Sequence, residues 1–150
     1  MDTAELGSTT VTIAEDHRHS RHLSESLHAA SVLAYSTGLL VLTSTNWYRL
    51  GEQRIGRTPW ELFPQHFPVR LHVILVLVAA IGSVLAVRTG EAGSGAHILL
   101  AGMTGLLAIA PFVLAGLTQP TAAVWLSALL ALLLTAEHVH RARELRHEGQ

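Results

Sequence analysis

The chain has 150 residues, of which 49% are hydrophobic and only 14% are charged, and its formal net charge is −1. Soluble domains carry about 25% charged residues, so this composition is typical of a membrane protein rather than of a large soluble core. The near-neutral charge offers no basic surface for nucleic acid. The absence of cysteine excludes disulfides, thiolate metal sites and a cysteine nucleophile.

The first 26 residues are polar and contain no apolar run, so we expect a flexible tail over residues 1–26. Three histidines, His17, His19 and His22, fall within six residues of this tail. Such a cluster binds a divalent metal only when a fold holds it together. No carboxylate pattern or further motif accompanies it, so we interpret it as a solvated stretch and predict no metal site.

Four apolar stretches follow, each close to the roughly 20 residues that a helix needs to cross a bilayer. They cover residues 27–46, 70–88, 96–117 and 121–140. The predicted fold is therefore all-α, an integral membrane four-helix bundle made of two transmembrane hairpins. Its four-helix domain occupies residues 27–140, and a charged carboxyl-terminal stub covers residues 141–150.

A long loop rich in proline and aromatic residues, 49–70, joins the two hairpins. Pro59, Pro64 and Pro68 prevent one continuous helix across it. The stretch from Trp60 to Phe63 indicates a short turn with its aromatic rings at the headgroup level. A specific docking role is the alternative, because long loops in small proteins often carry function.

The predicted helices differ in the side chains that they offer to neighbours. Small residues recur along the second and third helices, at Ala79, Ala80, Gly82, Ser83, Ala86, Ala101, Gly102, Gly105 and Ala108. Such faces allow close helix packing, within the chain or against a protein partner or a second copy. Pro111 is expected to kink the third helix near Leu107. The fourth helix is rich in leucine and is expected to face lipid.

Arginine supplies all ten basic residues, a coding bias that favours a bacterial source. With four crossings, both termini share one side of the membrane. That side collects six arginines, Arg18, Arg21, Arg88, Arg141, Arg143 and Arg146, and the other side collects Arg49, Arg54, Arg57 and Arg70. The positive-inside rule then places both termini in the cytoplasm of a cell whose plasma membrane the protein spans.

Histidines are the only candidates for chemistry within the predicted bundle. We expect His28, His97 and His138 near the inner boundary of the membrane and His72 near the outer one. Histidines on facing helices can bind haem b or a quinone. Those at helix ends also suit the interface without a partner. We find no Gly-rich phosphate loop, GxSxG or HExxH motif, and we predict no catalytic residue.

Three functions remain open on these observations. The leading hypothesis is a noncatalytic subunit or accessory protein of a membrane complex, which contacts its partner through the small-residue faces and the aromatic loop. The alternative is an electron-transfer subunit that binds haem b or a quinone through His28, His97, His138 and His72. A weaker alternative is a small transporter or channel hinged at Pro111. Whether His97 and His138 meet decides what the second hairpin can hold.

Overall fold

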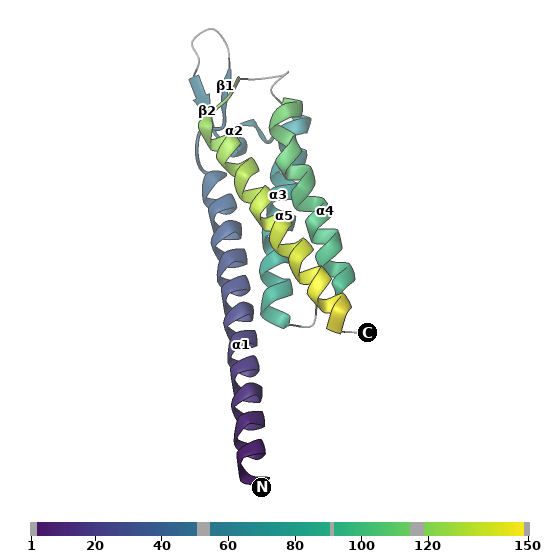
Figure 1. Ribbon diagram of the computed structural model, residues 1–150. Helices are drawn as coiled ribbons and strands as arrows, with labels where there is room; N and C mark the ends of the chain where they lie inside the picture. Colours follow the sequence, from purple (N-terminus) through teal and green to yellow (C-terminus); the bar gives the residue numbers. More distant parts are fainter. Residues whose placement is uncertain (1–2, 51–54, 91, 115–118, 149–150) are drawn as a thin grey trace. The chain divides into compact units, whose positions relative to one another are not determined.

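The computed structural model describes residues 3–50, 55–90, 92–114 and 119–148 (Figure 1). The chain divides into two compact units, Met1–Ala30 and Ser31–Gln150. The first unit holds the amino-terminal turns of helix α1. The second holds the end of α1 and all the other elements, and it contains every contact discussed below.

Helix α1 (Thr3–Leu42) begins 24 residues before the expected start at Leu27 and includes most of the expected tail. No proline occurs before Pro59, so nothing in the sequence forces a break in this stretch. The helix ends in a run of hydroxyl residues, where Thr43 and Thr45 donate their side-chain hydroxyls to the carbonyls of Leu40 and Leu42. These bonds satisfy carbonyls that a helix end leaves unpaired.

A small sheet ties the ends of distant helices together. Its strands are β1 (Tyr48–Leu50), β2 (Ile55–Arg57) and β3 (Gln119–Pro120), in the antiparallel order β2-β1-β3. Beside it, the Thr121 amide donates to the Trp47 carbonyl at 2.8 Å. Strand β3 and Thr121, which precede α5, are thereby hydrogen-bonded to the segment that follows α1.

Helix α2 (Pro59–Leu62) occupies the place where a short turn was expected. Thr58 and Glu61 form a capping box, in which the Glu61 carboxylate accepts from the Thr58 amide at 2.8 Å. This backbone hydrogen bond, followed by the bond from the Thr58 hydroxyl, holds the pKa of Glu61 below its ordinary value. The box pairs two backbone amides that would otherwise lack a partner at the start of α2.

Three helices form the main packed body of the second unit: α3 (Phe67–Thr89), α4 (Ser94–Leu114) and α5 (Ala122–Glu148). Helix α4 packs against both α3 and α5, and it stands beside them in Figure 1. Gly90 ends α3 with a φ of +64°, a left-handed conformation that glycine adopts without strain. Helix α4 continues through Pro111, and the predicted kink near Leu107 stays a prediction.

The all-α prediction is confirmed. In the described parts of the chain the elements are helices, apart from the three short strands above. Among the residues that the structure describes, two helices are long and apolar enough to cross a membrane, α3 and the Ala122–His147 part of α5. A shorter apolar helix covers Ser94–Ala110 of α4. These helices support membrane association of the chain.

Buried positions of the second unit are mostly apolar, from alanine up to Trp47, and they include several polar side chains. The apolar core combines side chains from the end of α1, the loop and all three long helices: Val32, Leu39, Trp47, Leu62, Val69, Val73, Val76, Ala79, Leu107, Ala108, Val124, Ala131 and Leu134. Of the expected small-residue faces, Ala79, Ala80, Ser83, Ala101 and Ala108 are buried. Gly102 has open space around it instead.

Candidate functional site: a buried histidine pair

His97 and His138 meet inside the second unit. His97 lies in the first turn of α4, His138 lies 41 residues later in α5, and both side chains are buried. Their Nδ1 atoms are 3.0 Å apart and their ring centroids 5.2 Å, with the ring planes inclined by 42°. The two histidines are therefore joined by a direct hydrogen bond.

Ser83 connects this histidine pair to helix α3. Its Oγ atom lies 2.8 Å from Nε2 of His138, and its hydroxyl donates to the Ala79 carbonyl at 2.6 Å. Ser83 is fully buried in α3. A chain of hydrogen bonds thus runs from α3 through α5 to α4, and we call Ser83, His138 and His97 the polar chain.

Proton positions in the polar chain follow from counting donors. The Ser83 hydroxyl has one hydrogen, which goes to Ala79, so Nε2 of His138 must donate to Oγ. A neutral His138 then accepts at Nδ1, and the hydrogen comes from Nδ1 of His97. For neutral rings, this assignment gives each of these three bonds one donor and one acceptor.

A second polar contact crosses the interface of α4 and α5. The hydroxyl oxygens of Thr104 and Thr135 lie 2.8 Å apart. Each hydroxyl also lies within hydrogen-bonding distance of a backbone carbonyl of its own helix. Thr104 is fully buried. Hydroxyls that bridge helices in this way join apolar helices that have no hydrophobic reason to associate in a bilayer.

His72 lies apart from the polar chain. It precedes Ser83 by 11 positions on α3, which is about 16 Å along a helix axis at about 1.5 Å per residue. Its ring is buried edge-on against Trp47, with centroids 4.9 Å apart, and neither ring nitrogen has a hydrogen-bond partner in the described part of the chain. His28 belongs to the first unit, so its position relative to these residues is not assigned.

Haem does not fit between the paired histidines. Axial ligands face each other across the iron, whereas Nδ1 of His97 and Nδ1 of His138 point at each other and share a hydrogen. Within the residues whose side chains are described, no group of three His, Cys, Asp or Glu side chains is close enough to hold a metal. The polar chain consists of two imidazole rings and one hydroxyl group, and the two Nδ1 atoms that face each other bond to each other.

The Ser83 hydroxyl beside an imidazole resembles the contact that activates a nucleophile. Here Ser83 is fully buried, and its hydrogen is donated to its own helix. A substrate would have to separate three packed helices to reach it. The polar chain is therefore suited to holding helices in one register, a use well attested for buried polar groups.

Sequence reasoning named His97 and His138 and missed Ser83, Thr104 and Thr135. Ser83 was noted only as a small residue, although a serine among alanines on a membrane helix is also a candidate for an interhelical hydrogen bond. Such a pattern identifies the serine as a candidate, but it does not predict which residue the serine bonds. Comparison with protein-family models, with curated proteins and with solved structures finds no match for this chain.

Proposed function

We propose that the protein is a multi-pass membrane protein whose four helices form two hairpins, and that it serves as a noncatalytic subunit or accessory protein of a membrane complex. The apolar residues 27–42 of α1 and the Ser94–Leu114 helix supply the two crossings beyond α3 and α5. Both termini then lie in the cytoplasm, on the side that carries six of the ten arginines.

One observation carries the membrane part of the proposal: large apolar side chains cover the outside of the helices, while several polar side chains lie buried among apolar ones inside. Large apolar side chains point outward along α3, α4 and α5, at Leu71, Ile74, Val78, Ile81, Leu85, Ile98, Leu99, Leu106, Ile109, Leu126, Leu129 and Leu132. The buried positions of the same helices include Ser83, His97, Thr104, Ser127 and His138. Water would penalise such a surface, whereas lipid covers it at no cost.

The accessory role is supported by what the buried polar groups do. Ser83, His138 and His97 bond to one another and across three helices, and the threonine pair bonds across two. These side chains form hydrogen bonds between helices of the same chain, as expected for a protein with a structural role. The outward apolar side chains leave surface available for a protein partner or for a second copy.

Electron transfer with haem b or a quinone is the second candidate. The meeting of His97 and His138 favours it, because a buried imidazole pair is an unusual feature of a membrane helix interface. The direct bond between their Nδ1 atoms counts against haem at this place. A quinone carbonyl would need one of the two rings to give up that bond and donate to the quinone instead.

Alkaline carbonate extraction of expressing cells tests the membrane part, and we expect the protein to stay in the pellet. Release into the supernatant would refute it. Light scattering of the protein purified in mild detergent then tests the accessory part. We expect a particle heavier than one 16.1 kDa chain with its detergent, with any added protein at fixed stoichiometry. A lone monomer refutes the accessory role. A Soret band from haem-replete cells would favour the electron-transfer candidate.

A further inference from the structure

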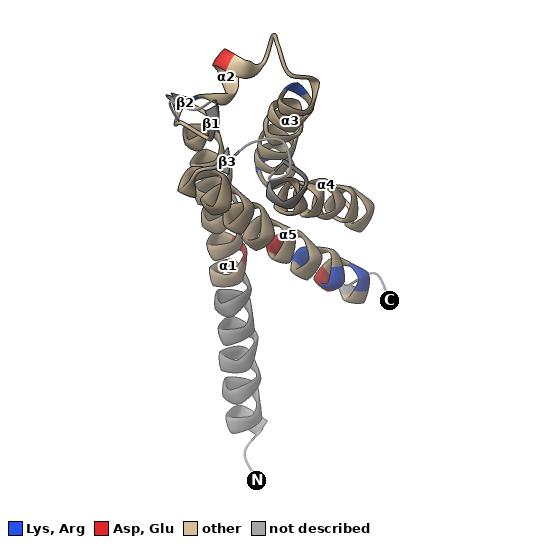
Figure 2. Cartoon of the chain, turned by 90° about the horizontal axis from the view of Figure 1, so that it is seen from above, with Lys and Arg blue, Asp and Glu red and all other residues tan. Residues whose placement is uncertain are grey.

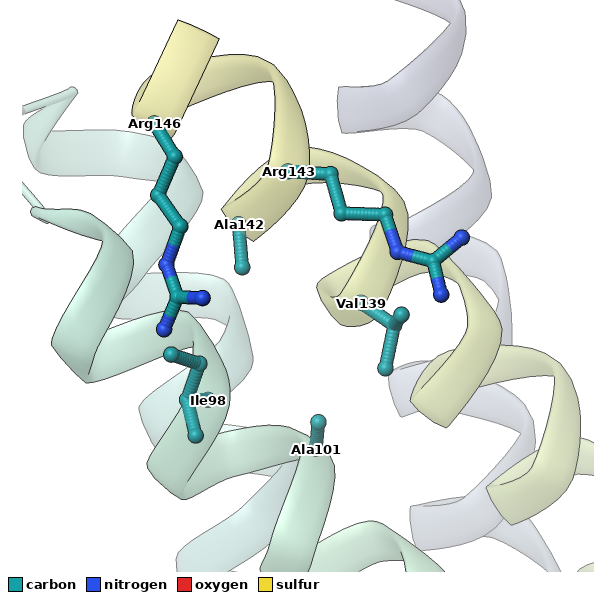
Figure 3. Close-up of a pocket in the computed structure, with 6 residues that line it drawn as sticks. All are labelled: Ile98, Ala101, Val139, Ala142, Arg143 and Arg146. Carbon is teal, nitrogen blue, oxygen red and sulfur yellow. The ribbon is translucent and has the colours of Figure 1, made fainter. Parts of the chain in front are cut away.

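A cleft opens between α4 and α5 close to the polar chain but outside it. It has a volume of about 260 Å³ and is lined by Ile98, Ala101, Val139, Ala142, Arg143 and Arg146. Figure 3 shows the four apolar side chains turned into the space between the helices, with Arg146 reaching from α5 toward Ile98. The two arginines stand on different sides of this apolar floor.

The position of the cleft along the helices matches the edge of a bilayer. On α5, the charged residues begin at Glu137 and gather toward the carboxyl end, whereas α4 shows no charged residue over its described length (Figure 2). Leu132 and Leu133 are exposed one turn before that change, and Ile98 and Leu99 are exposed at the beginning of α4. Val139 and Ala142 follow Glu137 on α5, so the cleft begins at the edge of the apolar region and extends, with its arginines, into the headgroup level.

The charge at the rim of the cleft is positive and uncompensated by the nearest carboxylate. Glu144 already accepts from Arg141 at 3.0 Å and pairs with His140 at 3.2 Å. Arg143 and Arg146 form no ion pair with any residue described in the structure. Arg146 reaches over the apolar floor, and the Arg143 guanidinium extends to the other side of the cleft (Figure 3), so the rim offers positive charge to one molecule that carries both a phosphate and a hydrocarbon chain.

We propose that this cleft binds one anionic phospholipid of the surrounding bilayer. Its phosphate lies at the Arg146 guanidinium, Arg143 adds positive charge at the other side of the rim, and the beginning of an acyl chain lies against Ile98, Ala101, Val139 and Ala142. The cleft is smaller than the pockets that enclose whole ligands, so the rest of the lipid stays in the membrane. The proposal rests on the membrane part of the proposed function and adds a ligand of defined charge at a defined place.

Native mass spectrometry of the protein in a non-ionic detergent, titrated with phosphatidylglycerol or phosphatidylcholine, tests this site. We expect phosphatidylglycerol to bind more tightly. An arginine near an anionic lipid surface contributes about fivefold in affinity, so Arg143→Gln with Arg146→Gln should weaken binding about 25-fold. Val139→Phe, which narrows the cleft and keeps both arginines, should also weaken it.

Arg88→Gln is the matched control, because Arg88 is exposed in the last turn of α3 outside the cleft. We expect it to leave phosphatidylglycerol affinity within about twofold of the original protein. Equal loss in this control, or unchanged affinity in the double variant, overturns the site. Displacement of the lipid by inorganic phosphate would overturn it as well, in favour of a free-anion site. Failure of the membrane proposal is a separate result, since the protein would then leave the membranes in alkaline carbonate.

Discussion

Ser83 has one hydroxyl hydrogen, and its donation to Ala79 determines the orientation of two histidines on other helices. The bond at 2.6 Å leaves Oγ able only to accept from His138, and His138 in turn can only accept from His97. Each of these residues therefore depends on the next for its hydrogen bond. Removal of one member leaves a buried polar group without its partner, which costs more than the bond itself contributes.

We predict that His138→Ala lowers the free energy of unfolding in detergent micelles by about 1–2 kcal/mol, because Ser83 and His97 both lose their bond to His138. His140→Ala is the matched control on the same helix. It removes an exposed ion pair with Glu144 and should cost only a few tenths of 1 kcal/mol. Equilibrium unfolding followed by circular dichroism measures both.

A double-mutant cycle of His97→Ala and His138→Ala isolates the bond between the two rings. We expect a coupling of about 0.6–1.7 kcal/mol, the range found for hydrogen bonds between membrane helices. Additive effects of the two substitutions would contradict a direct bond between Nδ1 of His97 and Nδ1 of His138.

At the scale of the element, α3 contacts α4 through a face where side-chain size is limiting. A Cβ atom built on Gly82 would lie 2.9 Å from Cδ2 of Leu100 on α4, too close for ordinary contact. A Cβ atom built on Gly102 of α4 would have no such neighbouring atom within 4 Å. Two glycines that look alike in the sequence therefore differ: one lies against a neighbouring helix and the other faces outward.

Gly82→Leu is predicted to lower the free energy of unfolding by about 1–3 kcal/mol, the usual effect of forcing extra atoms into a packed interface. Gly102→Leu adds the same atoms on the same pair of helices and should leave the unfolding midpoint unchanged or raised. Adding Leu100→Ala to the first variant makes room and should recover part of the loss. A stable Gly82→Leu protein would show that α3 and α4 do not approach this closely.

At the scale of the whole molecule, the proposed crossing of the membrane by α3 would place the segments before and after it on opposite sides. Gln65 precedes this helix, Gly93 follows it, and both positions are exposed. The chain has no cysteine, so a single introduced thiol at either position is a clean probe of topology.

We predict that Gln65→Cys reacts with a membrane-impermeant maleimide from outside the cell, and that Gly93→Cys reacts only after the cells are opened. This result follows if α3 crosses once and both termini are cytoplasmic. Gel shift of the labelled protein measures both. Labelling of both thiols from the same side would contradict a crossing by α3, and exchange of the two patterns would reverse the orientation.

Much of the helical fold was predictable because hydrophobicity and backbone hydrogen bonding are local properties. Residues 70–88 lie within α3 and residues 121–140 nearly within α5, and in the described part of the chain these two helices are both long and apolar enough to span a bilayer. The short turn at Trp60 was also predictable, since Thr58, Pro59 and Glu61 supply a cap, a first-turn proline and the third residue of a capping box. The early start of α1 was not predicted, because polar composition suggests disorder but does not itself break a helix.

The sequence by itself indicated the apolar helical stretches, and it placed His97 near the start of one of them and His138 near the end of the next. Depth along a helix follows from counting residues, so His97 and His138 were expected at one level, the base of the second hairpin. Only the tertiary structure decided that their rings meet, because the rotation of each helix about its axis depends on packing against its neighbours. The same packing brings Ser83 to His138 from 55 residues away and leaves His72 beside Trp47.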